Sequence, residues 1–256
     1  MKKITVVIPT CDNYSRLVEC VNSVLSQLHT KDELLVIDNN SKDDTQNYCL
    51  DMTERHHNFQ YFNTNLPVGI YGKPASRNIA AYYSNNETLL YVDDNEILHH
   101  MCVEYHKLLQ SSYNIVCGNR YDGPLGREVL STYFPFHMLN KPNLLFEYGA
   151  KFISDSGKAL LNEFVKTGDL KQIKQSNFSI KKDVVKNIGG WHEGFVVIDG
   201  NSGDEGEFND ELKIKGYLCC YSPFAISYVN KTYGKSIKHI NIDCFSISRN
   251  IVTKLL

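Results

Sequence analysis

The first half of this chain alternates short apolar runs with amphipathic helical periods, and this pattern most constrains its fold. The apolar runs cover residues 4–8, 34–37, 59–62, 89–92 and 114–117, and short continuous runs of this kind are typical of strands covered on both faces. Between them, apolar residues recur at helical spacing over residues 17–28 and 98–109, and Pro74 marks the start of another helix. The pattern predicts an α/β fold with a mostly parallel central sheet flanked by helices.

Length and composition fit a single domain. The chain has 256 residues, of which 42% are hydrophobic, and no internal repeat or low-complexity linker divides it. We therefore expect one domain over residues 1–256, with a regular half at 1–120 and a less regular half at 121–256. Residues 118–172 combine a Gly123-Pro124 turn with several aromatic side chains, which predicts an elaboration that faces a partner molecule.

Charge and cysteine content exclude several classes of protein. A formal net charge of −2 gives no basic field, so tight non-specific binding to nucleic acid is not expected. The eight cysteines lack C-x-x-C spacing and indicate reduced thiols. Residues 4–8 are too few for a signal peptide or a membrane span. We expect a cytoplasmic protein, and the mixed basic and apolar tail at 247–256 leaves open a peripheral contact with the inner face of a membrane.

Polar side chains follow three of the predicted strands at the point where each strand ends. They occupy residues 9–13, 38–41 and 93–95. Because the carboxyl ends of parallel strands meet at one edge of a sheet, and ligands bind there, these clusters are expected to share one rim.

Asp93, Asp94 and Asn95 have two interpretations. Their oxygens suit a hard divalent cation. Alternatively, they are a polar turn that caps a helix starting near Ile97.

Two further polar segments carry candidate binding residues. The segment from Asp38 to Asp44 fails the calcium-loop template, because Lys42 and Asp43 stand where an oxygen ligand and a glycine are needed. Two interpretations remain, and both can hold: Ser41 caps a helix, and Asp38 is a strand-end carboxylate that contacts a base. Arg77 lies in the first turn of a helix, where a bound anion would favour it; the alternative is a surface arginine with its head in water.

Taken together and in this order, these motifs resemble the family-2 inverting glycosyltransferases of the GT-A fold, over about residues 3–120 and 175–217. The resemblance implies a nucleotide diphosphate sugar as donor, usually a UDP-sugar. It assigns the donor to Pro9, Thr10, Asp12, Asp38, Asn39, Gly69, Arg77, Asp93 and Asp94. It also implies a Mg²⁺ or Mn²⁺ site at Asp94 and Asn95, with His239 either a further ligand or a structural histidine. The family usually has Asp at the position of Asn95, so the amide predicts weaker metal affinity.

The resemblance also assigns the acceptor side and the general base. Asn177, Trp191 and His192 fall in the acceptor-side motifs, although a lone tryptophan is as readily a core residue. Glu205 falls on the position of the base, with Asp204 in reserve because the order of the two acids is reversed relative to the family. Helix capping by the same acids is the alternative.

The resulting expectation is an inverting sugar transfer to a hydroxyl of a glycan or lipid-linked acceptor, in bacterial surface polysaccharide or glycoconjugate synthesis. A nucleotidyltransferase is the first alternative, but residues 9–16 contain no glycine for a phosphate loop. A nucleotide-sugar-binding module without turnover is the second, and Asn95 with the reversed acids favours it. The sequence indicates neither the donor sugar, the acceptor and linkage, nor the oligomeric state.

Overall fold

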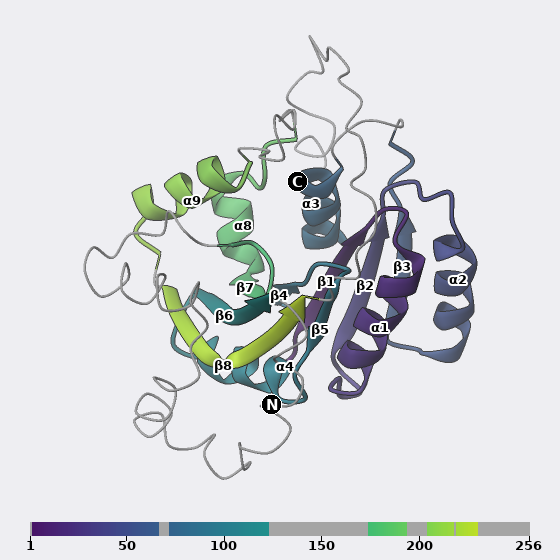
Figure 1. The fold of residues 1–256 in the computed structure, drawn as a ribbon. Helices are drawn as coiled ribbons and strands as arrows, with labels where there is room; N and C mark the ends of the chain where they lie inside the picture. Colours follow the sequence, from purple (N-terminus) through teal and green to yellow (C-terminus); the bar gives the residue numbers. More distant parts are fainter. Residues whose placement is uncertain (1, 67–71, 123–173, 194–203, 218, 230–256) are drawn as a thin grey trace.

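A computed structural model describes residues 2–66, 72–122, 174–193, 204–217 and 219–229. The described strands form one curled, mixed sheet of eight, in the order β3-β2-β1-β4-β7-β6-β8-β5 (Figure 1). The strands are β1 (Thr5–Thr10), β2 (Glu33–Asp38), β3 (Phe59–Asn63), β4 (Thr88–Tyr91), β5 (Glu96–Leu98), β6 (Ile115–Asp122), β7 (Phe178–Lys181) and β8 (Cys219–Val229).

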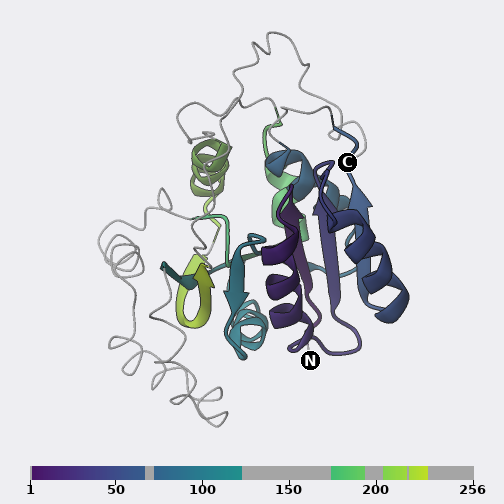
Figure 2. The same cartoon turned by 45° about the vertical axis from the view of Figure 1, so that its right-hand side comes forward.

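Helices cover both faces of this sheet. They are α1 (Tyr14–Leu25), α2 (Thr45–Arg55), α3 (Lys73–Tyr83), α4 (Cys102–Leu109), α8 (Lys182–Ile188) and α9 (Asp204–Ile214). In Figures 1 and 2, α1 and α2 lie on one face and α3 and α8 on the other. None of the helices in the described ranges is long and apolar enough to cross a membrane.

The strands of the first half are buried because both faces are covered. All six residues of β1 are buried, and so are all six of β2. Val6 and Ile8 pack into the core cluster with α1, whereas Val7 packs into the cluster with α3 and α8. This alternation along a strand explains why the sequence shows a continuous apolar run instead of a one-in-two pattern.

The parallel part of the sheet agrees with the predicted strands. β1 pairs in parallel with both β2 and β4, and β2 pairs in parallel with β3. Glycines follow two of the helices, since Gly189 at the end of α8 and Gly216 after α9 both have positive φ. The other side of the sheet, beyond β4, is mixed, because β7 runs antiparallel to both β4 and β6.

One helix prediction is wrong at its start. The helical spacing over 98–109 predicts a helix from Leu98, but Glu96–Leu98 form strand β5, and α4 begins only at Cys102. β5 pairs antiparallel with the end of the strongly curved β8, so that Glu96 lies opposite Val229 (Figure 1). No helix therefore follows Asn95 directly, and the interpretation of 93–95 as a helix cap is excluded.

Candidate active site

The polar ends of β1, β2 and β4 meet at one edge of the sheet, as the sequence predicts. In β1 and β2, Thr10 and Asp38 are in register. Across to β4, the Thr10 hydroxyl donates a hydrogen bond of 2.8 Å to Oδ2 of Asp94. This contact joins residues 84 positions apart and brings the first and third polar clusters together.

Asp94 is a carboxylate in a largely desolvated place. Burial raises its pKa to about 6, and the negative charge of Asp93 acts in the same direction. Hydrogen bonds from Thr10 and Asn13 and the charge of Lys73 oppose this increase. A bound cation would favour the ionised form, so the site suits a positively charged ligand.

Asp93 is held by cations instead. The Nζ of Lys73, the first residue of α3, lies 2.5 Å from Oδ1 of Asp93. Burial alone would raise the pKa of Asp93, but Lys73, Arg77 and Arg120 together hold it below its usual value. Asp93 is therefore ionised and paired with cations. The neighbouring Asp94 has a raised pKa, so a bound ligand can change its protonation state.

The side-chain oxygen of Asn95 is a candidate metal ligand. This oxygen, Oδ1, is buried and makes no hydrogen bond to any part of the chain that the structure describes. A buried carbonyl oxygen without a donor is costly, and a cation would satisfy it. Asp94 and Asn95 thus fit a hard divalent ion, although no group of three or more His, Cys, Asp or Glu side chains within the described ranges is arranged around one point.

The β1 and β2 loops are tied to each other at this rim. Asp12 has φ of 47° and accepts a 2.6 Å hydrogen bond from the backbone N–H of Lys42. Its own N–H donates to the Ser41 hydroxyl at 2.9 Å. Pro9 is buried within β1. An open hollow of about 360 Å³ lies beside these loops, lined by Asp12, Asn13, Tyr14, Ser15, Lys42, Asp43 and Asp44.

Asp38 is fully buried, and the chain already uses both of its oxygens. Oδ1 accepts hydrogen bonds from the N–H and the hydroxyl of Ser41, and Oδ2 accepts one of 2.7 Å from the Tyr61 hydroxyl. Next to it, Oδ1 of Asn39 accepts a hydrogen bond of 3.0 Å from Thr64. Contact between Asp38 and a base stays a prediction.

Arg77 is not a surface arginine, because its exposed fraction is only 1%. Its Nη1 donates to Oε1 of Gln175 at 2.7 Å and its Nη2 to the Gln175 carbonyl at 3.0 Å. The guanidinium also lies 5.7 Å from the centroid of the Trp191 ring. Its charge reaches Asp93, but contact with a phosphate remains a prediction.

Two of the predicted acceptor-side residues are core residues instead. Trp191 is 2% exposed and stacks on Phe208 with ring centroids 4.1 Å apart, which agrees with the alternative interpretation as a core tryptophan. Asn177 is 1% exposed. It donates to the Ala225 carbonyl at 2.7 Å and accepts from the His106 ring at 2.9 Å, so it fastens the chain before β7 to β8 and α4.

The loop after α8 is shaped by Asn78 of α3. Asn78 accepts a hydrogen bond from the N–H of Trp191 and donates to the Trp191 carbonyl and to Oε1 of Glu193. Gly190 has φ of 74°, and a Cβ there would lie 2.5 Å from the Asn78 side-chain oxygen, so only glycine fits. His192 is thereby held half-buried in the same loop.

Asp204 and Glu205 are the first two residues of helix α9. Farther along this helix, Phe208 and Leu212 are buried in the core cluster that contains Trp191. The general-base role of Glu205 or Asp204 stays a prediction. Gly69 and His239 lie outside the described residues, and so does most of the elaboration expected at 118–172, since 123–173 are not described.

Sequence reasoning missed several residues that surround Asp93. They are Lys73, Glu96, Arg120 and Ser176. The available signal was a charge where an apolar residue is expected, since Arg120 extends the apolar strand β6 and Glu96 opens the short strand β5.

Both sequence comparisons find glycosyltransferases. Residues 5–166 match the sequence profile described as glycosyl transferase family 2. Glycosyltransferase GlyA of Streptococcus pneumoniae is 26% identical over 121 residues, which are 46% of this chain and 17% of GlyA.

Two solved structures are similar in fold. TarS residues 1–349 from S. aureus, in complex with UDP-GlcNAc, has a TM-score of 0.61 at 18% identity, over 94% of this chain and 62% of that one. The mannosyltransferase PcManGT from Pyrobaculum calidifontis, in complex with GDP-Man and Mn²⁺, has a TM-score of 0.62 at 15% identity, over 90% and 57%. The chain thus spans less than two thirds of each relative.

Proposed function

Since the chain belongs to glycosyl transferase family 2, we propose that it transfers a sugar from a nucleotide diphosphate sugar, a UDP-sugar, to an acceptor hydroxyl with inversion at the anomeric carbon. The relatives of the same fold support a nucleotide-sugar donor, because one was solved with UDP-GlcNAc and another with GDP-Man. The acceptor is a glycan or a lipid-linked glycan, and the proposed setting is surface polysaccharide or glycoconjugate synthesis at the inner face of the membrane.

The observation that carries this proposal is the rim where Thr10 contacts Asp94 and the Asn95 oxygen has no hydrogen-bond partner among the described residues. We assign the donor diphosphate to this rim, with the base toward Asp38, Asn39 and Asp12. A divalent cation, Mn²⁺ or Mg²⁺, would be held by Asp94 and Asn95 and would neutralise the leaving diphosphate.

The remaining chemistry belongs to side chains of this chain. In the proposed displacement, the acceptor oxygen forms a bond to the anomeric carbon while the bond to the diphosphate oxygen breaks. The acceptor proton passes to the carboxylate of Glu205, with Asp204 as the second candidate. Lys73, which sits beside Asp93 with its side chain 29% exposed, adds positive charge at the edge where the diphosphate would lie.

The test is a panel of UDP- and GDP-sugars, measured first for thermal stabilisation with and without Mn²⁺ and then for nucleoside diphosphate release. We expect one UDP-sugar to stabilise the protein and to be turned over. Glu205→Gln should lower release about 100-fold or more while donor stabilisation persists. Glu207→Gln is the matched control, because Glu207 is an exposed acid on the same helix.

Each contrary result points to a different alternative. Stabilisation without release in the wild-type protein indicates a binding module, which the amide at Asn95 would favour. If Asp204→Asn abolishes release and Glu205→Gln does not, the general base is Asp204 and not Glu205. If none of the nucleotide sugars stabilises the protein, the proposed function is wrong.

A further inference from the structure

The turn that presents Asp94 and Asn95 is fixed at both of its ends. β4 ends at Tyr91 and β5 begins at Glu96, and the N–H of Glu96 donates to the Asp93 carbonyl at 3.0 Å. The two residues between Asp93 and Glu96 are those assigned above to the cation. Whatever holds Asp93 and Glu96 therefore determines where the oxygens of Asp94 and Asn95 point.

Glu96 is a charged residue in an unexpected place, since its exposed fraction is 0%. Burial raises its pKa, and Arg120 opposes that increase. Its Oε1 lies 2.8 Å from Nε of Arg120 and accepts a 2.6 Å hydrogen bond from the Ser176 hydroxyl. A buried carboxylate is retained only with such partners, so Glu96 needs both Arg120 and Ser176.

Arg120 and Ser176 both reach Asp93 as well. The Ser176 oxygen accepts a hydrogen bond of 2.8 Å from the backbone N–H of Asp93. Arg120 of β6 lies with Nη2 3.9 Å from Oδ2 of Asp93, whose other oxygen is paired with Lys73. Glu96 is thus linked to the backbone of Asp93 through one residue and to its carboxylate through the other.

We propose that Arg120 is a positioning residue, which acts with Glu96 and Ser176 to hold the turn of residues 93–96 in the shape that binds the donor diphosphate and its cation. The proposal rests on the function proposed above. Arg120 touches neither the sugar nor the reacting atoms in this role. Its planar guanidinium can address two carboxylates at once, which a lysine ammonium does less well.

The test is calorimetric titration of UDP at several Mn²⁺ concentrations. We expect Arg120→Met to weaken Mn²⁺-dependent UDP affinity about 10- to 100-fold, as is usual for residues that orient metal ligands. Arg120→Lys should recover part of the loss, because it keeps a cation between the two carboxylates. If Arg120→Met does not fold, the double variant Arg120→Met with Glu96→Gln avoids a buried unpaired charge and is titrated in its place.

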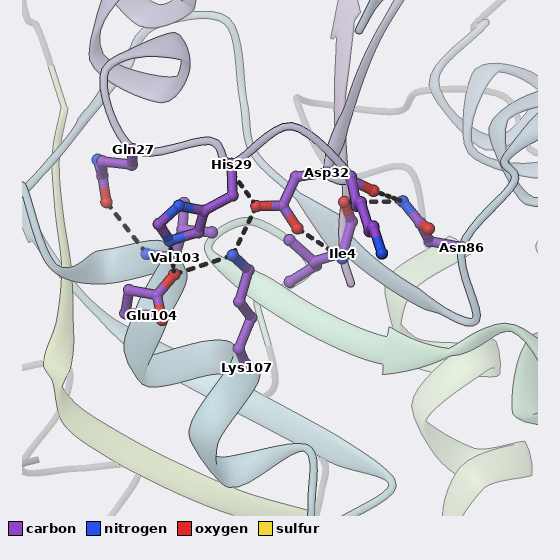
Figure 3. A network of polar contacts seen from close by, with 9 residues as sticks. Ile4, Gln27, His29, Asp32, Asn86, Val103, Glu104 and Lys107 are labelled. Carbon is purple, nitrogen blue, oxygen red and sulfur yellow. Dashed lines mark hydrogen bonds and ion pairs between the residues drawn. The ribbon is translucent and has the colours of Figure 1, made fainter. Parts of the chain in front are cut away.

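The matched control is Lys107→Met, which removes a buried cation at the opposite end of the sheet. Lys107 pairs with Asp32 at 2.6 Å, and Figure 3 shows this pair within a polar network that includes His29 and Glu104. Both substitutions should lower stability, but only the change at Arg120 should weaken UDP binding.

Three results would overturn the proposal: unchanged affinity in Arg120→Met, an equal loss in Lys107→Met, or no recovery in Arg120→Lys. These results presuppose that the wild-type protein binds UDP with Mn²⁺. If it binds no nucleoside diphosphate at all, the proposed function fails first, and the positioning role fails with it.

Discussion

His106 of α4 gives a sharp prediction about acid stability, because it is fully buried between two fixed partners. Its Nε2 lies 2.9 Å from Oδ1 of Asn177, and its Nδ1 lies 2.8 Å from the Ser179 hydroxyl. Because the Asn177 amide group donates to the Ala225 carbonyl, its oxygen faces the ring and accepts from Nε2–H. Nδ1 is then the acceptor for the Ser179 proton, and a second proton on the ring would break that bond.

The size of the effect follows from the pKa. Burial lowers the pKa of His106 from 6.5 to about 4. In the unfolded chain the ring protonates near pH 6.5, whereas in the folded protein it stays neutral until about pH 4. The unfolded state therefore binds more protons in this interval, and stability falls as the pH falls. The contribution is complete above about pH 6.5, and its loss reaches about 2 kcal/mol at pH 5 and about 3 kcal/mol at pH 4.

The assay is urea unfolding at pH 7.5, 6, 5 and 4 for the wild-type protein and for His106→Gln, which keeps a polar head but cannot titrate. Other groups also change stability with pH, so the informative quantity is the difference between the two proteins. We expect this difference to change by about 1.2 kcal/mol between pH 6 and pH 5, and by about 1 kcal/mol more by pH 4. A difference that is constant over this range would refute the assignment of a neutral, buried imidazole.

Three further predictions concern other parts of the molecule. Asn95→Asp should tighten Mn²⁺ binding about tenfold and Asn95→Ala should weaken it, because a carboxylate adds charge to the ligand set; calorimetry with Mn²⁺ checks this, and no change in either variant would place the cation elsewhere. Gly190→Ala should cost about 3 kcal/mol in urea unfolding, against about 1 kcal/mol for Gly189→Ala, since both have positive φ but only at Gly190 would a Cβ meet Asn78; equal costs would contradict the close approach. Lys107→Met should lower the free energy of unfolding by about 3 to 5 kcal/mol, because it leaves a buried carboxylate unpaired, and a loss below about 1 kcal/mol would show that this pair is solvated.

The parallel half of the fold was predictable because its signals are local. Strands β1, β2 and β4 each contain a run of apolar residues, and Pro74 stands in the first turn of α3 as expected. The shared rim also followed, since parallel strands bring their carboxyl ends to one edge. The Thr10–Asp94 contact confirms that expectation.

Strand β5 was not predictable for a physical reason. It has only three residues, and its sole described partner is β8, more than a hundred residues later in the chain. The apolar spacing of Leu98 and the residues after it fits a helix equally well in isolation. Pairing with a distant strand overrides local propensity here.

The roles of several site residues were not predictable either, because they depend on contacts with distant parts of the chain. Sequence supplies the chemical type of Trp191 and Asn177 but not their burial, and both proved to lie in the core. Conversely, Glu96 and Arg120 carry no motif of their own, because their significance arises from a contact between β5 and β6. A charge is informative only when its partner across the fold is known.

The most direct test of the account is calorimetric titration of UDP with Mn²⁺ into the wild-type protein and into Asp94→Asn. The substitution keeps the side-chain size and the oxygen near Thr10 but removes the charge assigned to the cation. The account predicts Mn²⁺-dependent binding to the wild-type protein and a loss of affinity of at least about tenfold in Asp94→Asn. Equal affinity in the two proteins, or binding that ignores Mn²⁺, would contradict the assignment of the donor diphosphate to this rim.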